Sequence, residues 1–272
     1  MKKIISILLI VMMGVVALTG CGSKGASAKS SGSDSSLESV KKSGKLLVGL
    51  DDGYPPMEFR DEKNNLVGFD VDLAREIGKK IGVKVEFIPT EFSGILLGLQ
   101  SKKFDTIIAG FTMTDERKKS LNFTEPYVLG GQIVAVKKGN ASIKKLSDLK
   151  GKIIGCQMGS AGQITAERKL KDIRELRKYG KITETFSDMS IGRIDAVIMD
   201  AQVGGYYISK KPGKFEVLDE MVAKEPMGIA FRKGDNALKN EVQKIINDLK
   251  KDGTLSKLSV KWFGFDAYKN QK

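Results

Sequence analysis

From Lys45 onward, short apolar runs alternate with longer amphipathic segments, and this alternation restricts the fold more than any other feature of the sequence. The run KLLVGL at 45–50 has the length of a buried strand, and GFDVDLAREIGKKIG at 68–82 spaces its apolar residues as a helix does. Acids in the first turn and Lys79–Lys80 in the last complement a helix dipole. VKVEFIP at 83–89 then alternates as a strand. Repeated strand–helix–strand units predict an α/β domain with a mostly parallel sheet.

The second half of the chain repeats this pattern. LSDLKGKIIGCQMGS at 146–160 predicts a short helix, a strand and a glycine-rich turn, and IGRIDAVIMD at 191–200 predicts another buried strand. The latter resembles KKFDTIIAG at 102–110, which has its aspartate and apolar residues in the same order. This internal echo predicts two similar lobes.

The predicted lobes are not contiguous in sequence. The first lobe comprises residues 37–129 plus 228–272, and the second comprises 133–223. Two crossing strands, near residues 129–133 and 223–228, are expected to join them. The tail NALKNEVQKIINDLKKDGTLSKLSVKWFG predicts two amphipathic helices separated at Gly253, with the Trp262–Phe263 pair packed on the first lobe.

Residues 1–20 have the composition of a secretion signal. Two lysines precede an almost unbroken apolar run of about 15 residues, shorter than the roughly 20 that span a membrane. The sequence LTGC resembles a lipobox, in which cleavage leaves the cysteine, here Cys21, to carry lipid. An ordinary secretion signal with an incidental cysteine is the alternative. Residues 21–36 would be the lipidated cysteine and a flexible tether, because 22–36 contain no large apolar side chain.

Composition excludes several kinds of chemistry. The chain has no histidine, and Cys156 is its only cysteine besides Cys21, so we expect no disulfide, no metal site, no cofactor and no catalytic residues. The formal charge of +13 falls to +11 without Lys2 and Lys3. The lysines occur as scattered pairs without interleaved aromatic residues, which argues against nucleic-acid binding.

Specific polar residues collect where predicted strands end. Asp51 and Tyr54 follow the first strand, AGFTMTDERKK at 109–119 follows the third, and CQMGSAG at 156–162 and IMDAQ at 198–202 follow two strands of the second half. Carboxyl ends of parallel strands in open α/β sheets border one crevice. If all four meet, the crevice offers one arginine, hydroxyls, a glycine-rich turn and aspartates.

These groups together suit a zwitterion. Arg117 can hold a carboxylate through two parallel hydrogen bonds, and N–H groups of a Gly-Ser-Ala-Gly turn at a helix start favour an anion. Asp200 ends an apolar strand, where a carboxylate requires a cationic partner. An anion site beside a cation site describes an α-amino acid.

Five segments in order resemble the substrate-binding proteins of polar amino-acid ABC importers, a group that includes the glutamine, histidine and lysine-arginine-ornithine binding proteins. The segments are DDGYPPMEF, GFDVDLAREIGKKIG, FSGILLGLQSKKFDTIIAGFTMTDERKKSLNFTEPY, GRIDAVIMD and KWFG, and the resemblance covers Lys45 to Gly264. It implies a two-lobed periplasmic-binding-protein type 2 fold. The implied protein is an extracytoplasmic monomer, lipid-anchored to the outer face of the cell membrane. It would deliver an L-amino acid to a membrane permease and its ATPase.

The resemblance also implies a set of ligand-binding residues. In this sequence they are Asp51, Tyr54, Phe92, Gly110, Thr112, Arg117, Gln157, Ser160, Ala161 and Asp200. Arg117 would take the α-carboxylate, helped by the N–H groups of Thr112, Ser160 and Ala161.

The other implied roles concern the ammonium group and the side chain of the ligand. The α-ammonium would contact the Gly110 carbonyl, the Thr112 hydroxyl and Asp200. Tyr54 and Phe92 would enclose the ligand side chain. With Arg117 and Asp200 on opposite lobes and linked only by ligand, binding would favour the closed state.

The chain departs from the family pattern at Gln157 and Met199, where glutamine binders carry lysine and histidine. It also has Ala161–Gly162 where the histidine and basic-residue binders carry Thr-Gln. Asp51 would lie near the far end of the ligand side chain. Without a lysine near it, Asp51 favours a basic or neutral side chain, with lysine, arginine or ornithine ahead of glutamine, histidine or cystine.

Two other functions stay open. A periplasmic dehydratase acting on a prephenate-like acid could share the fold, with Glu58 or Asp51 as its acid or base. A ligand-sensing domain that acts on a separate receptor is the other.

Overall fold

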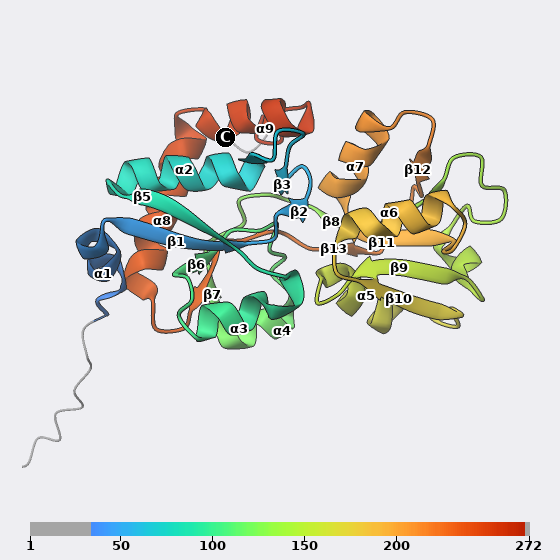
Figure 1. Cartoon of the computed structure of the whole chain (residues 1–272), viewed down its shortest axis with the longest axis horizontal. Coiled ribbons are helices and arrows are strands. Elements are labelled where there is room, and N and C mark those ends of the chain that lie inside the picture. Colours follow the sequence, from blue (N-terminus) through green and yellow to red (C-terminus); the bar gives the residue numbers. More distant parts are fainter. Residues whose placement is uncertain (1–33, 270–272) are drawn as a thin grey trace, which may run out of the picture. The chain divides into compact units, whose positions relative to one another are not determined.

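A computed structural model describes residues 34–269 of the chain. The predicted signal peptide, Cys21 and the tether up to residue 33 lie outside the described residues. Two large sheets organise the described part, and a third, three-stranded sheet of β2, β3 and β4 belongs to the first lobe (Figure 1). We call the first sheet with its helices the first lobe, and its elements are α1 (Ser36–Ser43), β1 (Lys45–Leu50), β2 (Gly53–Tyr54), β3 (Glu58–Arg60), β4 (Leu66–Val67), α2 (Phe69–Ile81), β5 (Lys84–Pro89), η1 (Phe92–Gly94), α3 (Ile95–Gln100), β6 (Thr106–Ile107), α4 (Asp115–Ser120), β7 (Leu121–Phe123), β14 (Ala230–Arg232), α8 (Asn236–Lys251) and α9 (Thr254–Phe263).

The second lobe is formed by the chain between β7 and β14. Its elements are β8 (Gly131–Lys137), η2 (Leu146–Leu149), β9 (Ile153–Gln157), α5 (Ala161–Lys169), β10 (Glu175–Tyr179), α6 (Ile182–Ser190), β11 (Ala196–Asp200), α7 (Ala201–Lys210), β12 (Phe215–Val217) and β13 (Ala223–Lys224). The predicted α/β, two-lobed architecture is confirmed.

Each sheet has a parallel part to which antiparallel strands are added. In the first sheet, β1 pairs in parallel with β5 and β6, whereas β14 runs antiparallel between β6 and β7. In the second, β9 pairs in parallel with β10 and β11, and β8 runs antiparallel to β11, β12 and β13. The antiparallel strands β8 and β14 are those that directly follow the passages of the chain from one sheet to the other.

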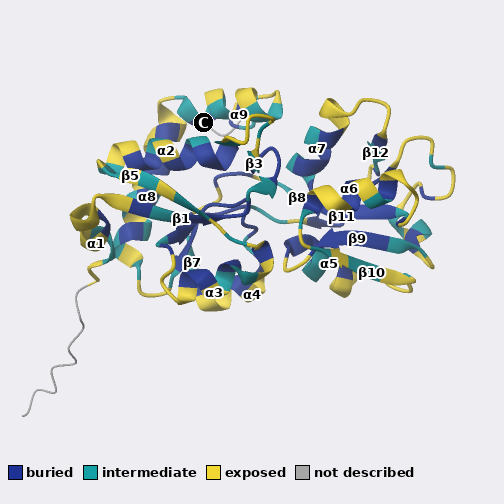
Figure 2. Ribbon diagram, in the orientation of Figure 1, coloured by how far each residue is buried: buried dark blue, intermediate teal, exposed yellow. Residues whose placement is uncertain are grey.

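Helices cover both faces of each sheet. Figure 1 shows α2 and α3 on opposite faces of the first sheet, and α6 and α5 on opposite faces of the second. Figure 2 shows that helix surfaces facing the sheets are buried while the outer surfaces are exposed, which is the pattern that amphipathic spacing predicts. The predicted helix at 68–82 is α2, whose buried residues include Val71, Ala74 and Ile77.

The two segments that link the sheets run side by side. Met227 forms isolated bridges with Thr112 and with Val128, and the Met227 N–H donates to the Val128 carbonyl at 2.9 Å. The domain limits predicted above, and bending at these segments, stay predictions.

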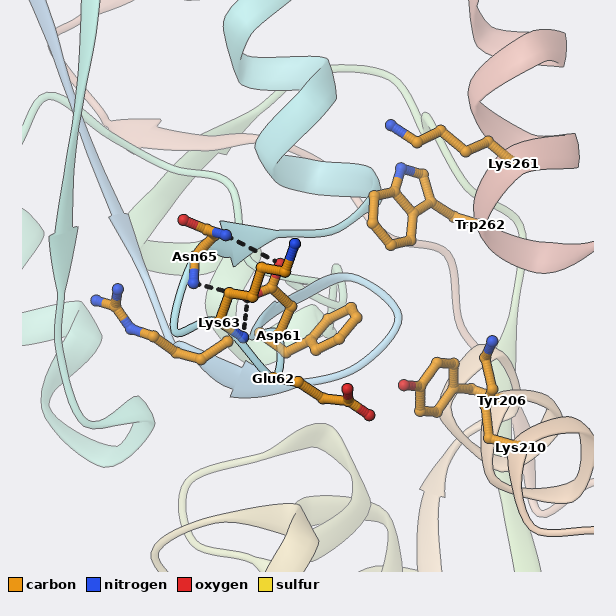
Figure 3. A pocket seen from close by; sticks show the side chains of 10 residues that line it. Asp61, Glu62, Lys63, Asn65, Tyr206, Lys210, Lys261 and Trp262 are labelled. Carbon is orange, nitrogen blue, oxygen red and sulfur yellow. Dashed lines mark hydrogen bonds between the residues drawn. The ribbon is translucent and has the colours of Figure 1, made fainter.

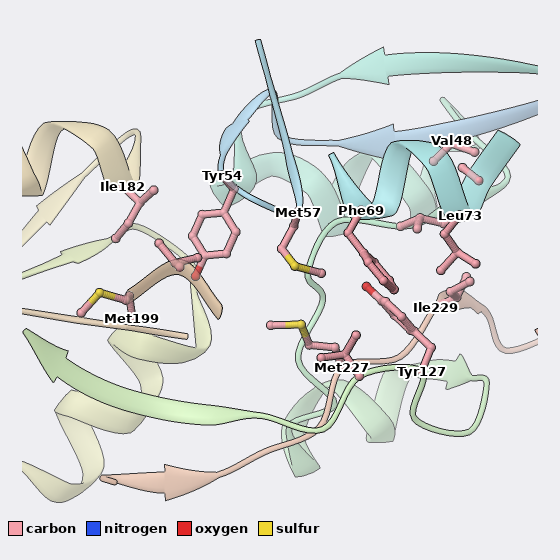
Figure 4. Close-up of a cluster of buried hydrophobic side chains, with 14 of the residues drawn as sticks. Val48, Tyr54, Met57, Phe69, Leu73, Tyr127, Ile182, Met199, Met227 and Ile229 are labelled. Carbon is pink, nitrogen blue, oxygen red and sulfur yellow. The ribbon is translucent and has the colours of Figure 1, made fainter. Parts of the chain in front are cut away.

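Apolar packing is continuous from one lobe to the other. Figure 4 shows Tyr54 of the first lobe close to Ile182 and Met199 of the second, in a cluster that also includes Met57 and Tyr127. All five side chains are buried. The two lobes are therefore in contact in this structure.

The C-terminal helices pack as the sequence predicts. α8 and α9 meet at Gly253, which has a left-handed φ of 79°. The Trp262 indole donates to Asp72 at 2.9 Å, and the Phe263 ring stacks on Phe69 with centroids 4.8 Å apart. No helix within residues 34–269 combines the length and apolar character needed to cross a membrane.

Candidate ligand-binding site

The structure brings together the four strand ends that the sequence singles out. Direct contacts join them across the two lobes: Tyr54 with Asp200, Thr112 with Asp200, Arg117 with Gly159, and Asp51 with Gln157. Convergence of these segments, which the sequence alone leaves open, is confirmed by geometry.

Arg117 is held by carbonyl groups and aromatic rings. Its guanidinium donates to the carbonyl of Thr112 at 2.9 Å and to the carbonyl of Gly159 at 3.0 Å. The guanidinium carbon lies 3.9 Å from the centre of the Phe111 ring and 5.6 Å from that of Phe92. The side chain is buried, and burial lowers the pKa of Arg117 to about 10.

Asp200 is held by neutral donors. Its carboxylate accepts from the Tyr54 hydroxyl at 2.6 Å, from the Gln132 amide at 2.6 Å and from the Thr112 hydroxyl at 3.3 Å. Burial raises the pKa of Asp200 to about 6, against the opposing effect of these hydrogen bonds. Gln132, at the start of β8, is a partner that the sequence analysis missed.

Neither of these two charges has a direct charged partner. The ion pairs formed within residues 34–269 include neither Arg117 nor Asp200. Two opposite charges are thus buried in one region, where each influences the pKa of the other but the hydrogen bonds named above go to neutral groups in both cases. The sequence predicts that a ligand alone links the two residues across the lobes. The structure differs, because Tyr54 and Thr112 already bind Asp200 from the first lobe, and Arg117 already binds Gly159 of the second.

Gly110 is held from behind by a buried carboxylate. Its N–H donates to Asp70, which also accepts from the Tyr127 hydroxyl at 2.9 Å. Gly110 has φ of 52°, a left-handed conformation that glycine adopts without strain, and it follows β6, which ends at Ile107. The apolar run FDTIIAG at 104–110 has the composition of a longer strand, but only Thr106–Ile107 forms one, and the residues after Ile107 form a loop.

Asp70 lies against a second buried carboxyl group. Burial, and next the charge of Asp70, raise the pKa of Glu58 well above its usual range. Neither Glu58 oxygen accepts a hydrogen bond from another group. Glu58 and Asp70 thus form a buried acidic pair in which ionisation of Glu58 is disfavoured, and Asp70 accepts the Gly110 N–H.

The start of α5 supplies N–H groups to the same region. Ser160 caps this helix, since its hydroxyl accepts from the Gln163 N–H at 3.1 Å, and Ala161 is the first helical residue. The first N–H groups of a helix have no intrahelical acceptor. The Ser160 N–H differs, because it donates to the Gln157 carbonyl at 3.3 Å in a turn.

Asp51 has a charged partner that the sequence analysis missed. Its carboxylate accepts from the Lys181 ammonium at 2.6 Å and from the Gln157 amide. The inference that Asp51 has no lysine nearby is therefore wrong. Lys181 follows β10, an edge strand whose alternating sequence ELRKY was not interpreted as a strand. The rule that functional residues follow strand ends would have found Lys181.

The two aromatic residues lie in different surroundings. Tyr54 is a buried residue whose hydroxyl reaches Asp200, and Phe92 packs beside Phe111 with ring centres 5.8 Å apart. Their contact with a ligand side chain stays a prediction.

Cys156 lies near the end of β9 and is buried. Burial raises the pKa of its thiol to about 12, as expected of a packed core residue.

A separate cavity of about 710 Å³ opens between the β3–β4 hairpin, α7 and α9 (Figure 3). Tyr206 and Trp262 line it together with Lys210 and Lys261. None of the residues predicted to bind ligand line this cavity, so we do not regard it as the candidate site.

The geometry can be compared with known proteins. Residues 46–265 match the bacterial extracellular solute-binding proteins, family 3. The chain belongs to this family. The L-cystine-binding protein TcyJ of Escherichia coli (strain K12) is 37% identical over 259 residues, which cover 95% of this chain and 96% of that protein.

Two solved structures are similar as well. An ancestral arginine-binding protein bound to arginine is 46% identical with a TM-score of 0.77, over 81% of this chain and 99% of that one. The ancestral amino acid-binding protein AncCDT-1, a precursor of cyclohexadienyl dehydratase, is 40% identical with a TM-score of 0.79, over 84% of this chain and 99% of that one.

Proposed function

We propose that this protein captures one L-α-amino acid between its lobes and delivers it to the permease and ATPase of an ABC importer. The observation that carries the proposal is the pair of buried, oppositely charged side chains, Arg117 and Asp200, which form no ion pair within residues 34–269. A ligand with a carboxylate and an ammonium group supplies both partners at once. Names of similar proteins, which bind cystine or arginine, support an amino acid as the ligand.

In this proposal the ligand binds with its α-carboxylate on Arg117. The guanidinium offers two parallel N–H groups, and the free N–H groups at the start of α5, at Ala161, add dipoles of the same sign. The α-ammonium binds Asp200, the Thr112 hydroxyl and the Gly110 carbonyl.

Ligand binding favours closure because its contacts come from both lobes. Tyr54, Thr112 and Arg117 belong to the first lobe and Asp200 to the second. A ligand held by both sets stabilises the closed form by its differential affinity for that form. The closed form would then dock on the permease as a monomer, tethered to the membrane by lipid on Cys21.

A dehydratase is the second candidate, since the similar AncCDT-1 is described as a precursor of one. The surroundings of its two candidate acids favour binding instead. The Asp51 carboxylate is paired with the Lys181 ammonium, and Glu58 is buried beside the charge of Asp70. We therefore propose that the protein is not an enzyme. The remaining alternative, a ligand-sensing domain that acts on a separate receptor, would use the same closure of the two lobes over the ligand.

Calorimetric titration of the ligand-stripped protein with each common L-amino acid tests the proposal. We expect micromolar or tighter binding to one or a few of them, and loss of that binding in Arg117→Met. Absence of binding across the whole set, including cystine, would reject amino-acid capture. Turnover of a prephenate-like acid would move the assignment to the dehydratase.

A further inference from the structure

Asp51, which the family resemblance places near the far end of the ligand side chain, has its charge already neutralised. The Asp51 carboxylate is fully buried and has a donor on each oxygen. Oδ1 accepts from the Lys181 ammonium at 2.6 Å and from the Gly53 N–H at 3.1 Å, and Oδ2 accepts from the Gln157 amide. A cationic ligand side chain would thus meet a carboxylate whose acceptor positions are taken.

Lys181 is fixed in this position by several contacts. Its ammonium also lies 3.2 Å from Asp52 and 3.7 Å from Glu91. Burial lowers the pKa of Lys181, but the hydrogen bond and charge of Asp51 outweigh that effect, so its pKa stays above the usual value. Burial raises the pKa of Asp51, and the Lys181 ammonium opposes that rise. At a separation of 2.6 Å we take the pair as ionised at neutral pH.

The first lobe is shaped to admit this lysine. A Cβ atom at Gly53 would lie 2.8 Å from the Lys181 Cδ atom, so the lysine stem passes directly over a residue that has no side chain. On the second lobe, the Lys181 N–H donates to Glu184 at 3.0 Å at the start of α6, which fixes the backbone from which the stem extends. The stem therefore has a defined path from one lobe to the other.

We propose that Lys181 determines the specificity of the site by filling, with its own ammonium, the place that Asp51 would offer to a basic ligand. The inference rests on the amino-acid binding proposed above and adds which class of amino acid the site prefers. A lysine, arginine or ornithine side chain has to displace Lys181 or approach it as a like charge, and both are unfavourable. The favoured ligand has a polar side chain of zero net charge. Its far end is either an amide or a second amino-acid head, whose carboxylate and ammonium would match Lys181 and Asp51.

Competition calorimetry with glutamine, cystine and arginine tests this inference in the wild type and in Lys181→Met. We expect the wild type to bind glutamine or cystine at least about tenfold more tightly than arginine, on the scale of one desolvated like-charge contact. In Lys181→Met the affinity for arginine relative to glutamine should rise at least about tenfold, because Asp51 then lacks its cation. Lys181→Gln, which keeps a donor, should shift the ratio in the same direction.

Arg168→Met is the matched control. Arg168 of the second lobe pairs with Glu116 of the first at 3.3 Å, so this variant also removes a cation that links the lobes, but one without contact to Asp51. Its ratio of arginine to glutamine affinity should equal that of the wild type. A wild type that binds arginine most tightly, or an unchanged ratio in Lys181→Met, would overturn the inference and leave amino-acid capture standing. Failure to bind any amino acid would reject the proposed function itself.

Discussion

The two ends of the candidate site treat charge in opposite ways. At one end, Arg117 and Asp200 are buried and contact only neutral groups. At the other, Asp51 and Lys181 contact each other at 2.6 Å. An unpaired buried charge is costly, whereas a paired one needs no further partner. The difference teaches where a charged ligand gains most: the Arg117–Asp200 end favours a zwitterionic head, and the Asp51–Lys181 end favours a neutral tail.

The largest effect should come from removing a charge at the first end. Asp200→Ala should weaken amino-acid binding by about 2–5 kcal/mol, since the ligand ammonium loses its only carboxylate partner in a buried site. Isothermal titration of the ligand found for the wild type measures this.

Glu216→Ala serves as a control for that substitution. Glu216 is a carboxylate of the second lobe paired with Lys138 at 3.0 Å, and it lies on β12, outside the candidate site. Its loss should leave affinity unchanged. An Asp200→Ala variant that binds as well as this control would remove Asp200 from the site.

The same unpaired carboxylate should reduce the stability of the ligand-free protein near neutral pH. Because the pKa of Asp200 is raised from 3.8 to about 6, the folded state holds its proton more tightly than the unfolded state does. The favourable contribution of protonated Asp200 to the free energy of unfolding is complete below the pKa of the unfolded state, and it is lost as pH rises through about 6. Relative to Asp200→Asn, the wild type should therefore lose up to about 3 kcal/mol of unfolding free energy between pH 4 and pH 7.

Urea denaturation of both proteins across this pH range measures the effect. Asp148 provides a contrast, because hydrogen bonds from the N–H groups of Lys144 and Lys145 lower the pKa of this exposed carboxylate. Its contribution is present above the unfolded pKa and is lost as pH falls, so Asp148→Asn should change the pH dependence with the opposite sign. Parallel pH curves for wild type and Asp200→Asn would mean that Asp200 is not strained by burial.

The paired end should govern how far the lobes close without ligand. Lys181→Met removes the ammonium that joins Asp51 and Asp52 to the second lobe. We expect the free-energy difference between the closed and open forms to shift by about 1 kcal/mol in favour of the open form, as for a partly exposed ion pair. Small-angle scattering of the ligand-free variant should show a larger radius of gyration. Arg168→Met should have a smaller effect, because both partners of that pair are more than half exposed. Equal opening in the two variants would contradict the distinction between the ends.

Sequence patterns predicted the framework of this molecule because each signal is local. α2 and α8 follow from apolar residues spaced by three and four positions, and Arg117 and Asp200 follow from their places after apolar strands. The turn at Gly110 was harder to predict, because its apolar neighbours favour a longer strand while the left-handed bend depends on Asp70, 40 positions earlier.

Pairing between distant segments could not be obtained from these patterns. Asp51 and Lys181 are 130 positions apart, and Lys181 follows a polar edge strand whose burial alternates only weakly. Tyr54 and Asp200, separated by 146 positions, meet only because the two lobes contact each other. The ligand preference inferred from Asp51 alone was therefore wrong in its premise, since the charge of a buried group has meaning only with its partners.

The close approach of Lys181 to Gly53 also has an evolutionary consequence. A side chain at position 53 would force the Lys181 stem to shift, because the added Cβ would lie 2.8 Å from the lysine Cδ. Family members with a side chain at position 53 should therefore carry a lysine at 181 less often than those with glycine there. Under the proposal above, loss of that lysine would mark the point in the family tree at which the pocket became open to basic ligands.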